Sequence, residues 1–232
     1  VYKRQLRFYT NITHELRTPL TLILGPLEDM QKETSLPAKQ AQKLSVIHQS
    51  ALRLLNLINQ ILEFRKTETQ NKKLCVSKGN IAPLIYEIGL KYKELNQKTK
   101  IDFQIQIEKE EMLLFFDKEI ITIVLDNLIS NAIKYTEQGR VTLSLYQTMR
   151  NEVAYTEIKV SDTGYGISAE ALPHIFDRYY QESGKHQASG TGIGLALVKN
   201  LVTLHEGEIR AESIQNEGST FYILSLIHIS EP

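Results

Sequence analysis

His14 is followed by a carboxylate and, one helical turn later, by a hydroxyl. Glu15 is the next residue, and Thr18 lies four residues from His14, so a helix would place the threonine on the histidine's face. The carboxylate could orient the imidazole and take its proton, which would leave a neutral ring nitrogen as a nucleophile. A histidine on an exposed helix is more often only solvated. That plainer interpretation applies to three histidines without such neighbours: His48, His205 and His228.

A second group of polar residues follows more than a hundred residues later, on one predicted helix. Asn127, Asn131 and Lys134 are spaced four and three residues apart, so they project from one helical face. Mg²⁺ prefers oxygen ligands and keeps several waters, so one asparagine carbonyl plus phosphate oxygens would suffice for a metal–triphosphate. Lys134 could neutralise a phosphate directly. The plainer alternative is that these amides cap neighbouring groups or face water.

Two glycine-rich segments could complete a nucleotide site. Asp162-Thr-Gly-Tyr-Gly-Ile ends a predicted strand, where the carboxylate could accept from an exocyclic amine and the glycines let the backbone approach a flat ring. A simple turn is the alternative for so short a motif. Gly190-Thr-Gly-Ile-Gly-Leu enters a predicted helix, whose first N–H groups favour phosphate. A dinucleotide-binding fold would need a strand directly before it, whereas QESGKHQAS predicts a loop that closes over a nucleotide.

The elements that must hold these residues begin with a predicted helical hairpin over residues 1–70. Apolar residues recur there in a 3,4 alternation on either side of a turn at Glu33 to Pro37. The seam comprises Leu6, Tyr9, Thr13, Leu16, Leu20, Ile23, Leu27 and Met30, then Leu44, Ile47, Ala51, Leu54, Ile58 and Ile61. Each helix buries only a narrow stripe, so we expect a second copy to complete a four-helix bundle, that is, a homodimer.

A second domain is predicted over residues 78–226, after a linker at 71–77 and before a tail at 227–232 that looks foreign to it. Helical and strand patterns mix in this domain without a regular βαβ repeat. Helices are predicted at 81–96, from Lys118 with Asp117 as its cap, and at 192–205; strands are predicted at 101–107, 112–116, 141–146, 153–160, 208–213 and 220–224. The pattern favours an α+β chain whose second domain is an α/β sandwich, with one mixed sheet and helices stacked on one face.

Composition narrows the range of partners. Lys plus Arg and Asp plus Glu both number 27, so no overall basic surface attracts nucleic acid, and we expect none as a partner. The single cysteine, Cys75, cannot form an internal disulfide, which suits a reducing cytosol. No apolar run is long enough to cross a bilayer, so a membrane could be reached only through segments absent here.

Taken together, these motifs resemble those of sensor histidine kinases. The string F-x-x-N-I-T-H-E-L-R-T-P resembles the phosphoacceptor box of that family almost letter for letter. NLISNAIKYT, DTGYGI, FDRYY and GTGIGL resemble the N, G1, F and G2 boxes of an ATP-binding domain shared with type II topoisomerases, heat-shock chaperones and mismatch-repair ATPases. The resemblance covers residues 117–221 and, with the histidine box, nearly the whole chain.

The resemblance implies a role for each matching residue. Asn131 would be the Mg²⁺ ligand, and Asp162 would read the adenine amino group. Arg178, in Phe176-Asp-Arg-Tyr-Tyr, would reach the γ-phosphate during transfer. The other implied ATP-binding residues are Asn127, Lys134, Tyr135, Gly164, Gly166, Ile167, Gly190, Thr191, Gly192, Gly194, Leu195 and, near the base, Thr220. One glycine of the family's third pair is replaced by Asn216, which also tolerates a left-handed backbone.

The implied function is a homodimeric sensor histidine kinase core, the cytoplasmic portion of an inner-membrane bacterial sensor. It would phosphorylate His14 from Mg²⁺-ATP, with Glu15 as the base, and pass the phosphoryl group to a response-regulator aspartate. The receiver domain could be separate or, as in hybrid sensors, on the same polypeptide. The spacing of Glu15 and Thr18 resembles the family's phosphatase motif. The alternative is an ATP-binding signalling scaffold without kinase activity; a related ATPase or serine kinase would lack the hairpin and its histidine.

Overall fold

The computed structural model describes residues 19–30, 37–68, 73–96, 100–150, 153–181 and 192–225. The chain forms two compact units, residues 1–72 and 73–232. The domain limits expected from the sequence stay predictions. Among the described residues, no helix combines the length and the apolar character that crossing a membrane requires.

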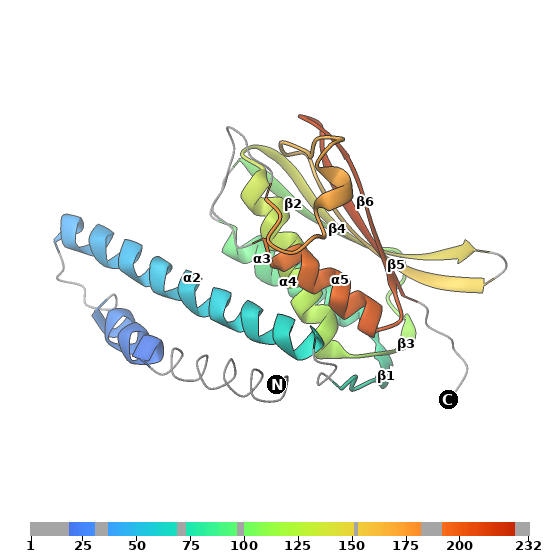
Figure 1. The fold of residues 1–232 in the computed structure, drawn as a ribbon, viewed down its shortest axis with the longest axis horizontal. Coiled ribbons are helices and arrows are strands. Elements are labelled where there is room, and N and C mark those ends of the chain that lie inside the picture. Colours follow the sequence, from blue (N-terminus) through green and yellow to red (C-terminus); the bar gives the residue numbers. More distant parts are fainter. Residues whose placement is uncertain are drawn as a thin grey trace. The chain divides into compact units, whose positions relative to one another are not determined.

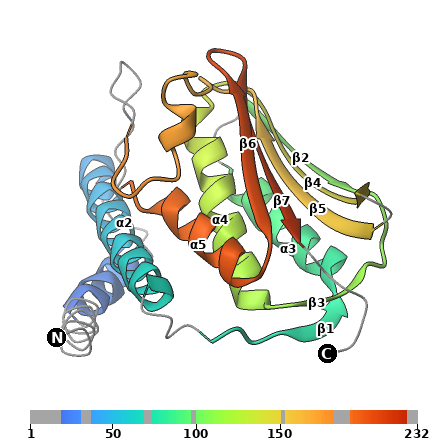
Figure 2. The same cartoon turned by 45° about the vertical axis from the view of Figure 1, so that its right-hand side comes forward.

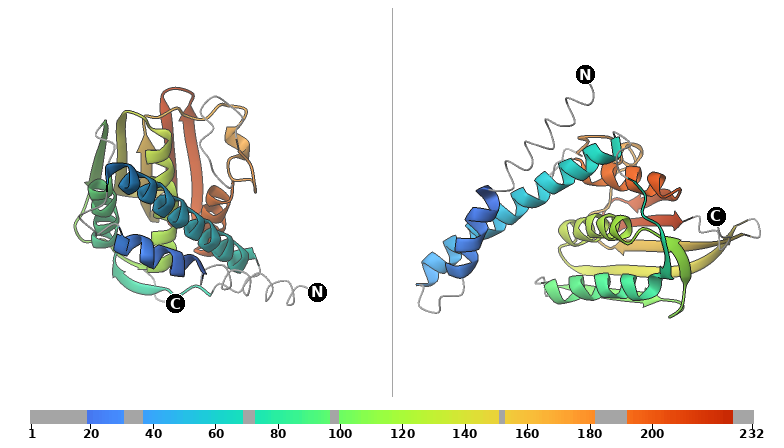
Figure 3. Two further views of the ribbon diagram at one scale, coloured as in Figure 1. Left: turned by 90° about the vertical axis from the view of Figure 1, so that its left-hand side faces the viewer. Right: turned by 90° about the horizontal axis from the view of Figure 1, so that it is seen from below.

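The described part of the first unit is a pair of packed helices. Residues 19–30 are helical, and α2 spans Ala38–Glu68. Leu20 and Leu24 of the first helix form one apolar cluster with Ala51 and Ile58 of α2, and Figures 1 and 3 show the two helices packed together. The predicted helical N-terminal region is confirmed. Most of the predicted turn at Glu33 to Pro37 lies outside the described residues.

The predicted apolar seam is only partly covered within one chain. The buried seam positions are Leu20, Leu27, Leu44, Ala51 and Ile58. Ile23, Met30, Ile47 and Leu54 are instead between 44% and 52% exposed. The physical reason is that each helix has one neighbour along this hairpin, so only one side of its apolar stripe is covered.

The second unit is one mixed sheet with helices on one face. Its strands are β2 (Ile101–Ile107), β4 (Gly139–Arg150), β5 (Val153–Asp162), β6 (Glu208–Ile214) and β7 (Gly218–Ser225), in the order β2-β4-β5-β7-β6. β2 and β4 are parallel and the other pairs are antiparallel. Figure 2 shows α3 (Ile81–Leu95), α4 (Lys118–Tyr135) and α5 (Gly194–Leu204) on the same face. The predicted α/β sandwich is confirmed.

A small second sheet was not expected from the sequence. β1 (Ser77–Asn80) pairs antiparallel with β3 (Leu113–Phe116), with Ser77 opposite Phe116. A short 3₁₀ helix, η1, covers Leu172–His174. The strand β1 contains a lysine, a glycine and an asparagine and is only four residues long, so it carries no alternating apolar pattern for the sequence to reveal.

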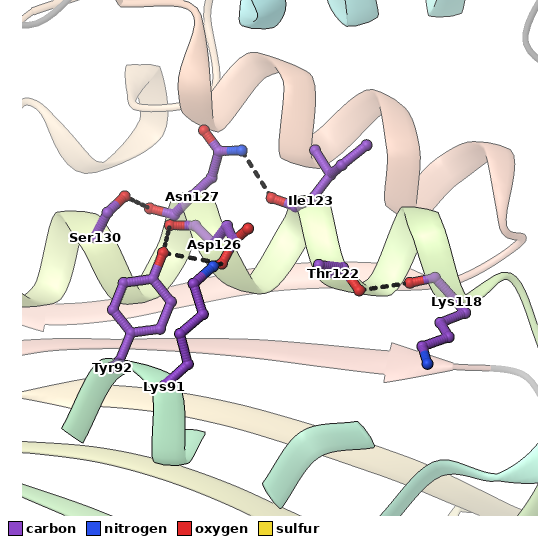
Figure 4. Close-up of polar contacts among 8 residues, drawn as sticks. All are labelled: Lys91, Tyr92, Lys118, Thr122, Ile123, Asp126, Asn127 and Ser130. Atoms are coloured by element: carbon purple, nitrogen blue, oxygen red, sulfur yellow. Dashed lines mark hydrogen bonds and ion pairs between the residues drawn. The ribbon is translucent and has the colours of Figure 1, made fainter. Parts of the chain in front are cut away.

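The middle helix α4 is held at its start and along its side. Asp117 caps it as predicted, because its Oδ1 accepts the N–H groups of Glu119 and Ile120 at 3.0 and 3.1 Å. Asp126, farther along α4, accepts from the Tyr92 hydroxyl at 2.9 Å and from the Lys91 ammonium at 3.2 Å (Figure 4). Both partners belong to α3, so this polar cluster joins the two helices.

Candidate functional site

Asn127 lies on α4 and faces the start of α5. Its side chain is buried, its Nδ2 donates to the Ile123 carbonyl at 2.7 Å, and Figure 4 shows it pointing away from α3 and toward α5. A Cβ added to Gly194, the first residue of α5, would come 3.0 Å from the Asn127 Oδ1. The Asn127 amide N–H therefore bonds to its own helix, which is the plainer of the two interpretations of this residue. Its oxygen faces the start of α5.

Asn131 and Lys134 continue the same side of α4. Asn131 is half-buried, and its side-chain amide has no hydrogen-bond partner among the residues that the structure describes. The Lys134 ammonium lies 3.1 Å from the Tyr135 hydroxyl and 4.6 Å from the centre of the Tyr135 ring. An amide oxygen and an ammonium therefore lie near the end of α4. The oxygen could bind a metal ion, and the ammonium supplies a positive charge.

Asp162 is a buried carboxylate at the end of β5. It is 8% exposed, and it accepts the N–H groups of Gly164, at 2.9 Å, and Ser219. Burial raises the pKa of Asp162, and these two backbone hydrogen bonds partly offset that rise. A carboxylate has about four lone-pair sites, so it can still accept from a ligand amine.

The glycines beside Asp162 are required by close backbone packing. A Cβ at Gly164 would overlap the Tyr135 carbonyl oxygen, and a Cβ at Gly166, where φ is 66°, would overlap the Ile214 carbonyl oxygen. Gly218, at φ 119°, packs in the same way on the Asp162 carbonyl. Asn216 has φ 66°, so it adopts the left-handed backbone expected in place of the missing glycine.

The hydroxyl next to Asp162 belongs to Ser219, not to Thr220. Ser219 stands directly opposite Asp162 across the β5–β7 pair and is buried. Thr220, predicted near the base, is the next residue and therefore points to the other face of the sheet, where its hydroxyl lies 2.8 Å from that of Ser161. The role expected of Thr220 stays a prediction, and the strand pairing favours Ser219 as the hydroxyl on the face of Asp162. Ser219 is two residues before the buried Phe221, so both side chains point to the same face of the strand. This alternation in the sequence could have identified Ser219.

Ser213 also went unnoticed in the sequence. Its hydroxyl donates to the Gly218 carbonyl at 2.8 Å and accepts the Ile167 N–H at 2.8 Å. It lies 3.0 Å from the Ser219 hydroxyl, which must donate because Ser213 has only one proton to give. Ser213 therefore fastens the loop after Asp162 to the turn before Ser219.

The segment that carries Arg178 is attached to the start of α5. Tyr179 adopts φ 62°, which is unusual for a large side chain, and its N–H donates to the Gly192 carbonyl at 2.9 Å. A Cβ at Gly192 would lie 2.6 Å from the Tyr179 carbonyl carbon. Arg178 is exposed and Leu195 is half-buried. The described part of the glycine-rich segment thus packs directly on the Arg178 turn.

Several predicted site residues lie outside the described residues. These are His14, Glu15, Thr18, Gly190 and Thr191. The segment expected to close over a nucleotide lies there too, apart from Gln181. Nothing in the structure tests their roles, which stay predictions.

Two histidines interpreted as solvated are in fact enclosed. The His48 side chain is 17% exposed, and its Nε2 lies 3.7 Å from a carboxylate oxygen of Glu28 on the preceding helix. His205, at the end of α5, is 8% exposed, and its Nε2 accepts the Asp117 N–H at 3.0 Å. The expectation was wrong for both because their covering residues come from other elements. His228 lies outside the described residues.

Both parts of the chain match known protein families. Residues 116–227 match the family described as "Histidine kinase-, DNA gyrase B-, and HSP90-like ATPase". Residues 4–70 match the "His Kinase A (phospho-acceptor) domain". The first match contains the α4 face, Asp162 and the start of α5, and the second contains His14.

Individual relatives agree with these matches. Histidine kinase P4 of Formosa agariphila is 36% identical over 229 residues, which make up 96% of this chain and 16% of that protein. The autoinducer 2 sensor kinase/phosphatase LuxQ of Vibrio vulnificus is 33% identical over 226 residues, 95% of this chain and 26% of LuxQ. The crystal structure of full-length ShkA in complex with AMPPNP has a TM-score of 0.77 and 23% identity, over 97% of this chain and 47% of ShkA. The ShkA likeness shows the fold alone. The chain spans less than a third of either curated relative's length.

Proposed function

We propose that this chain, which belongs to the sensor histidine kinases, is the ATP-dependent core of such a kinase and phosphorylates itself on His14. One observation carries the proposal: the buried Asp162 carboxylate, which two backbone N–H groups hold in place beside the end of α4. The fixed acceptor suits an adenine amino group, and it stands in the part of the chain that matches an ATPase family.

The residues present fit a nucleotide and its metal ion. Asp162 would accept from the adenine amine, and Gly164, Gly166 and Ile167 would line the base, with Ser219 rather than Thr220 beside it. The amide oxygen of Asn131, which has no partner among the described residues, would be the protein's ligand to Mg²⁺. The residues proposed to face the phosphates and ribose are Asn127, Lys134, Tyr135, Gly190, Thr191, Gly192, Gly194 and Leu195.

The proposed reaction is phosphoryl transfer to an imidazole nitrogen. His14 attacks the γ-phosphorus, the bond from that phosphorus to the β–γ bridging oxygen breaks, and ADP leaves. Glu15 orients the ring and takes the proton of the attacking imidazole. Arg178 contacts the γ-phosphate and balances its charge as the bond breaks. ATP complexed with Mg²⁺ supplies the phosphoryl group and the counter-charge.

We further propose that phospho-His14 passes its phosphoryl group to an aspartate of a response-regulator receiver domain. Thr18 would hold a water for the reverse task, hydrolysis of the regulator's phospho-aspartate. LuxQ is named a kinase/phosphatase, and this chain is similar to it over 95% of its own length. The half-exposed seam residues Ile23, Met30, Ile47 and Leu54 support a homodimer, because a second hairpin would cover them. The place proposed for this core is the cytoplasmic side of a membrane sensor.

Labelling with γ-³²P-ATP tests the proposal. We expect the chain to acquire an acid-labile, base-stable phosphate in the presence of Mg²⁺. His14→Gln should abolish it while binding of ATP persists, and His48→Gln should leave it intact as the matched control. ATP binding without labelling of the parent chain would favour the scaffold alternative, and undiminished labelling of His14→Gln would place the acceptor elsewhere.

A further inference from the structure

His205 takes part in a buried polar junction that the proposed chemistry does not use. Its Nε2 accepts the Asp117 N–H at 3.0 Å, so the ring is neutral with its proton on Nδ1. Asp117 and His205 are 3% and 8% exposed. Without the imidazole acceptor, the Asp117 N–H would be buried and unsatisfied, which is costly and therefore uncommon in folded proteins.

Asp117 joins three parts of the second unit. Its Oδ1 caps α4, and its Oδ2 accepts the Cys75 N–H at 2.8 Å. Cys75 belongs to residues 73–76, the described segment that leads into this unit. The next residues form β1, whose Ser77 pairs with Phe116, the residue directly before Asp117. The entry segment, the start of α4 and the end of α5 therefore meet at Asp117.

The same two helices also meet at the candidate nucleotide site. At that end the first residue of α5, Gly194, packs on the Asn127 oxygen. At the other end the residue after α5, His205, bonds to the cap of α4. α4 and α5 are in contact, and Figure 2 shows them as neighbouring helices. The two contacts fix α5 against α4 at both of its ends.

We propose that His205 is a positioning residue that, through Asp117, holds the entry segment 73–76 to the two helices of the ATP site. This role rests on the proposed kinase function. If the entry segment is released, more residues separate His14 from the fixed part of the second unit, and a longer free connection lowers the effective concentration of the groups that it joins. Loss of the His205 acceptor leaves the buried Asp117 N–H unsatisfied, which favours a shift of Asp117 away from α5 and weakens its bond to the Cys75 N–H. We expect the entry segment to become more mobile, while Asp162 and its glycines are unchanged.

Two variants of His205 test whether its Nε2 acceptor is needed for the bond to the Asp117 N–H. In His205→Gln the amide oxygen reaches about as far as Nε2, whereas in His205→Asn it stops near the position of Nδ1. We expect the Gln variant to behave as the parent. The Asn variant should bind ATP within about threefold of the parent but phosphorylate His14 at least about threefold more slowly, a change in kcat and not in KM.

Cys75 provides a direct readout, because it is exposed and is the chain's only cysteine. A nitroxide on its sulfur leaves the bonded backbone N–H in place, and its spectrum reports motion of the entry segment without any need for kinase activity. We expect narrower lines in His205→Asn and parent-like lines in His205→Gln. Unchanged lines in the Asn variant would overturn the proposal, as would a parallel loss of ATP binding and of thermal stability, which indicates a purely structural role. If the parent chain lacks kinase activity, the proposed function fails, and the nitroxide spectra still decide whether His205 holds the segment.

Discussion

The carboxylate of Asp162 accepts the backbone N–H of Ser219, the residue directly opposite it across the β5–β7 pair. The acceptor is therefore oriented by the sheet itself and by the Gly164 N–H, before any ligand arrives. Removal from water raises the pKa of this carboxyl group. A site built in this way has a fixed acceptor whose charge is costly to maintain, and both properties can be measured.

We expect the affinity for ATP to depend on pH through Asp162. Its pKa is raised, so as pH falls the carboxylate is protonated earlier than an ordinary aspartate and loses its charge. The Kd for ATP should therefore rise as pH falls through this raised pKa. Asp162→Asn should weaken binding at neutral pH by about 1.5–3 kcal/mol, roughly ten- to hundredfold, and should remove the pH dependence. Calorimetric titration between about pH 4 and 8 measures both.

The stability of the ligand-free chain should show the opposite trend. A raised folded-state pKa means that the folded chain binds the proton more tightly than the unfolded chain does. The stabilising contribution of Asp162 is fully present below its unfolded-state pKa and is lost as pH rises through its folded-state pKa.

GTP is the control for base recognition, because its keto oxygen has no proton for Asp162, and it should bind poorly. Equal affinities for ATP and GTP would remove Asp162 from that role.

Removal of two neighbouring hydroxyls should have unequal effects on nucleotide affinity. Ser219→Ala removes the hydroxyl that donates to Ser213, and Ser213 in turn accepts the Ile167 N–H. We expect a loss of about 0.5–1.5 kcal/mol in ATP binding, up to roughly tenfold. Thr220→Val removes a hydroxyl of the same kind on the opposite sheet face and should leave the Kd within about twofold. A larger effect at Thr220 than at Ser219 would restore the expectation drawn from the sequence.

The contrast between these two residues shows what kind of information the sequence carried. Asp117 as a cap and Asn216 as a left-handed residue were both predictable, because each depends on its own backbone and its immediate neighbours. The face on which Thr220 lies depends on its strand's parity. The burial of His205 depends on Asp117, 88 residues earlier in the chain. Periodicity describes one element at a time, so it identified the helices and the strands of the main sheet but neither β1 nor the contacts that join the elements.

The contact between α3 and α4 should contribute to stability through Tyr92. Burial, together with the adjacent Asp126 charge and hydrogen bond, raises the pKa of this tyrosine, so its hydroxyl stays a donor. Tyr92→Phe should lower the free energy of unfolding by about 1.5 kcal/mol, since the bond is made to a charged group. Lys91→Ala removes the other, more exposed partner of Asp126 and should cost less than about 1 kcal/mol. Denaturant unfolding compares the two variants; an equal loss would show that the exposed ammonium contributes as much as the buried hydroxyl.

The half-covered seam of the helical hairpin should form the dimer contact. Ile47 lies on the predicted seam and is 52% exposed, while its neighbour Val46 is off the seam and 59% exposed. If a second copy covers the seam, Ile47→Glu removes the burial of the exposed half of the side chain, about 0.7–1.5 kcal/mol at each of two symmetric positions. Dimer dissociation should then become roughly tenfold to a hundredfold easier. Val46→Glu introduces the same charge on the next residue and should leave the dimer intact. Sedimentation equilibrium distinguishes the variants, and ATP binding by the second unit should be unchanged in both. A dimer that survives Ile47→Glu, or one that Val46→Glu disrupts equally, would mean that the subunits meet through another face of the hairpin.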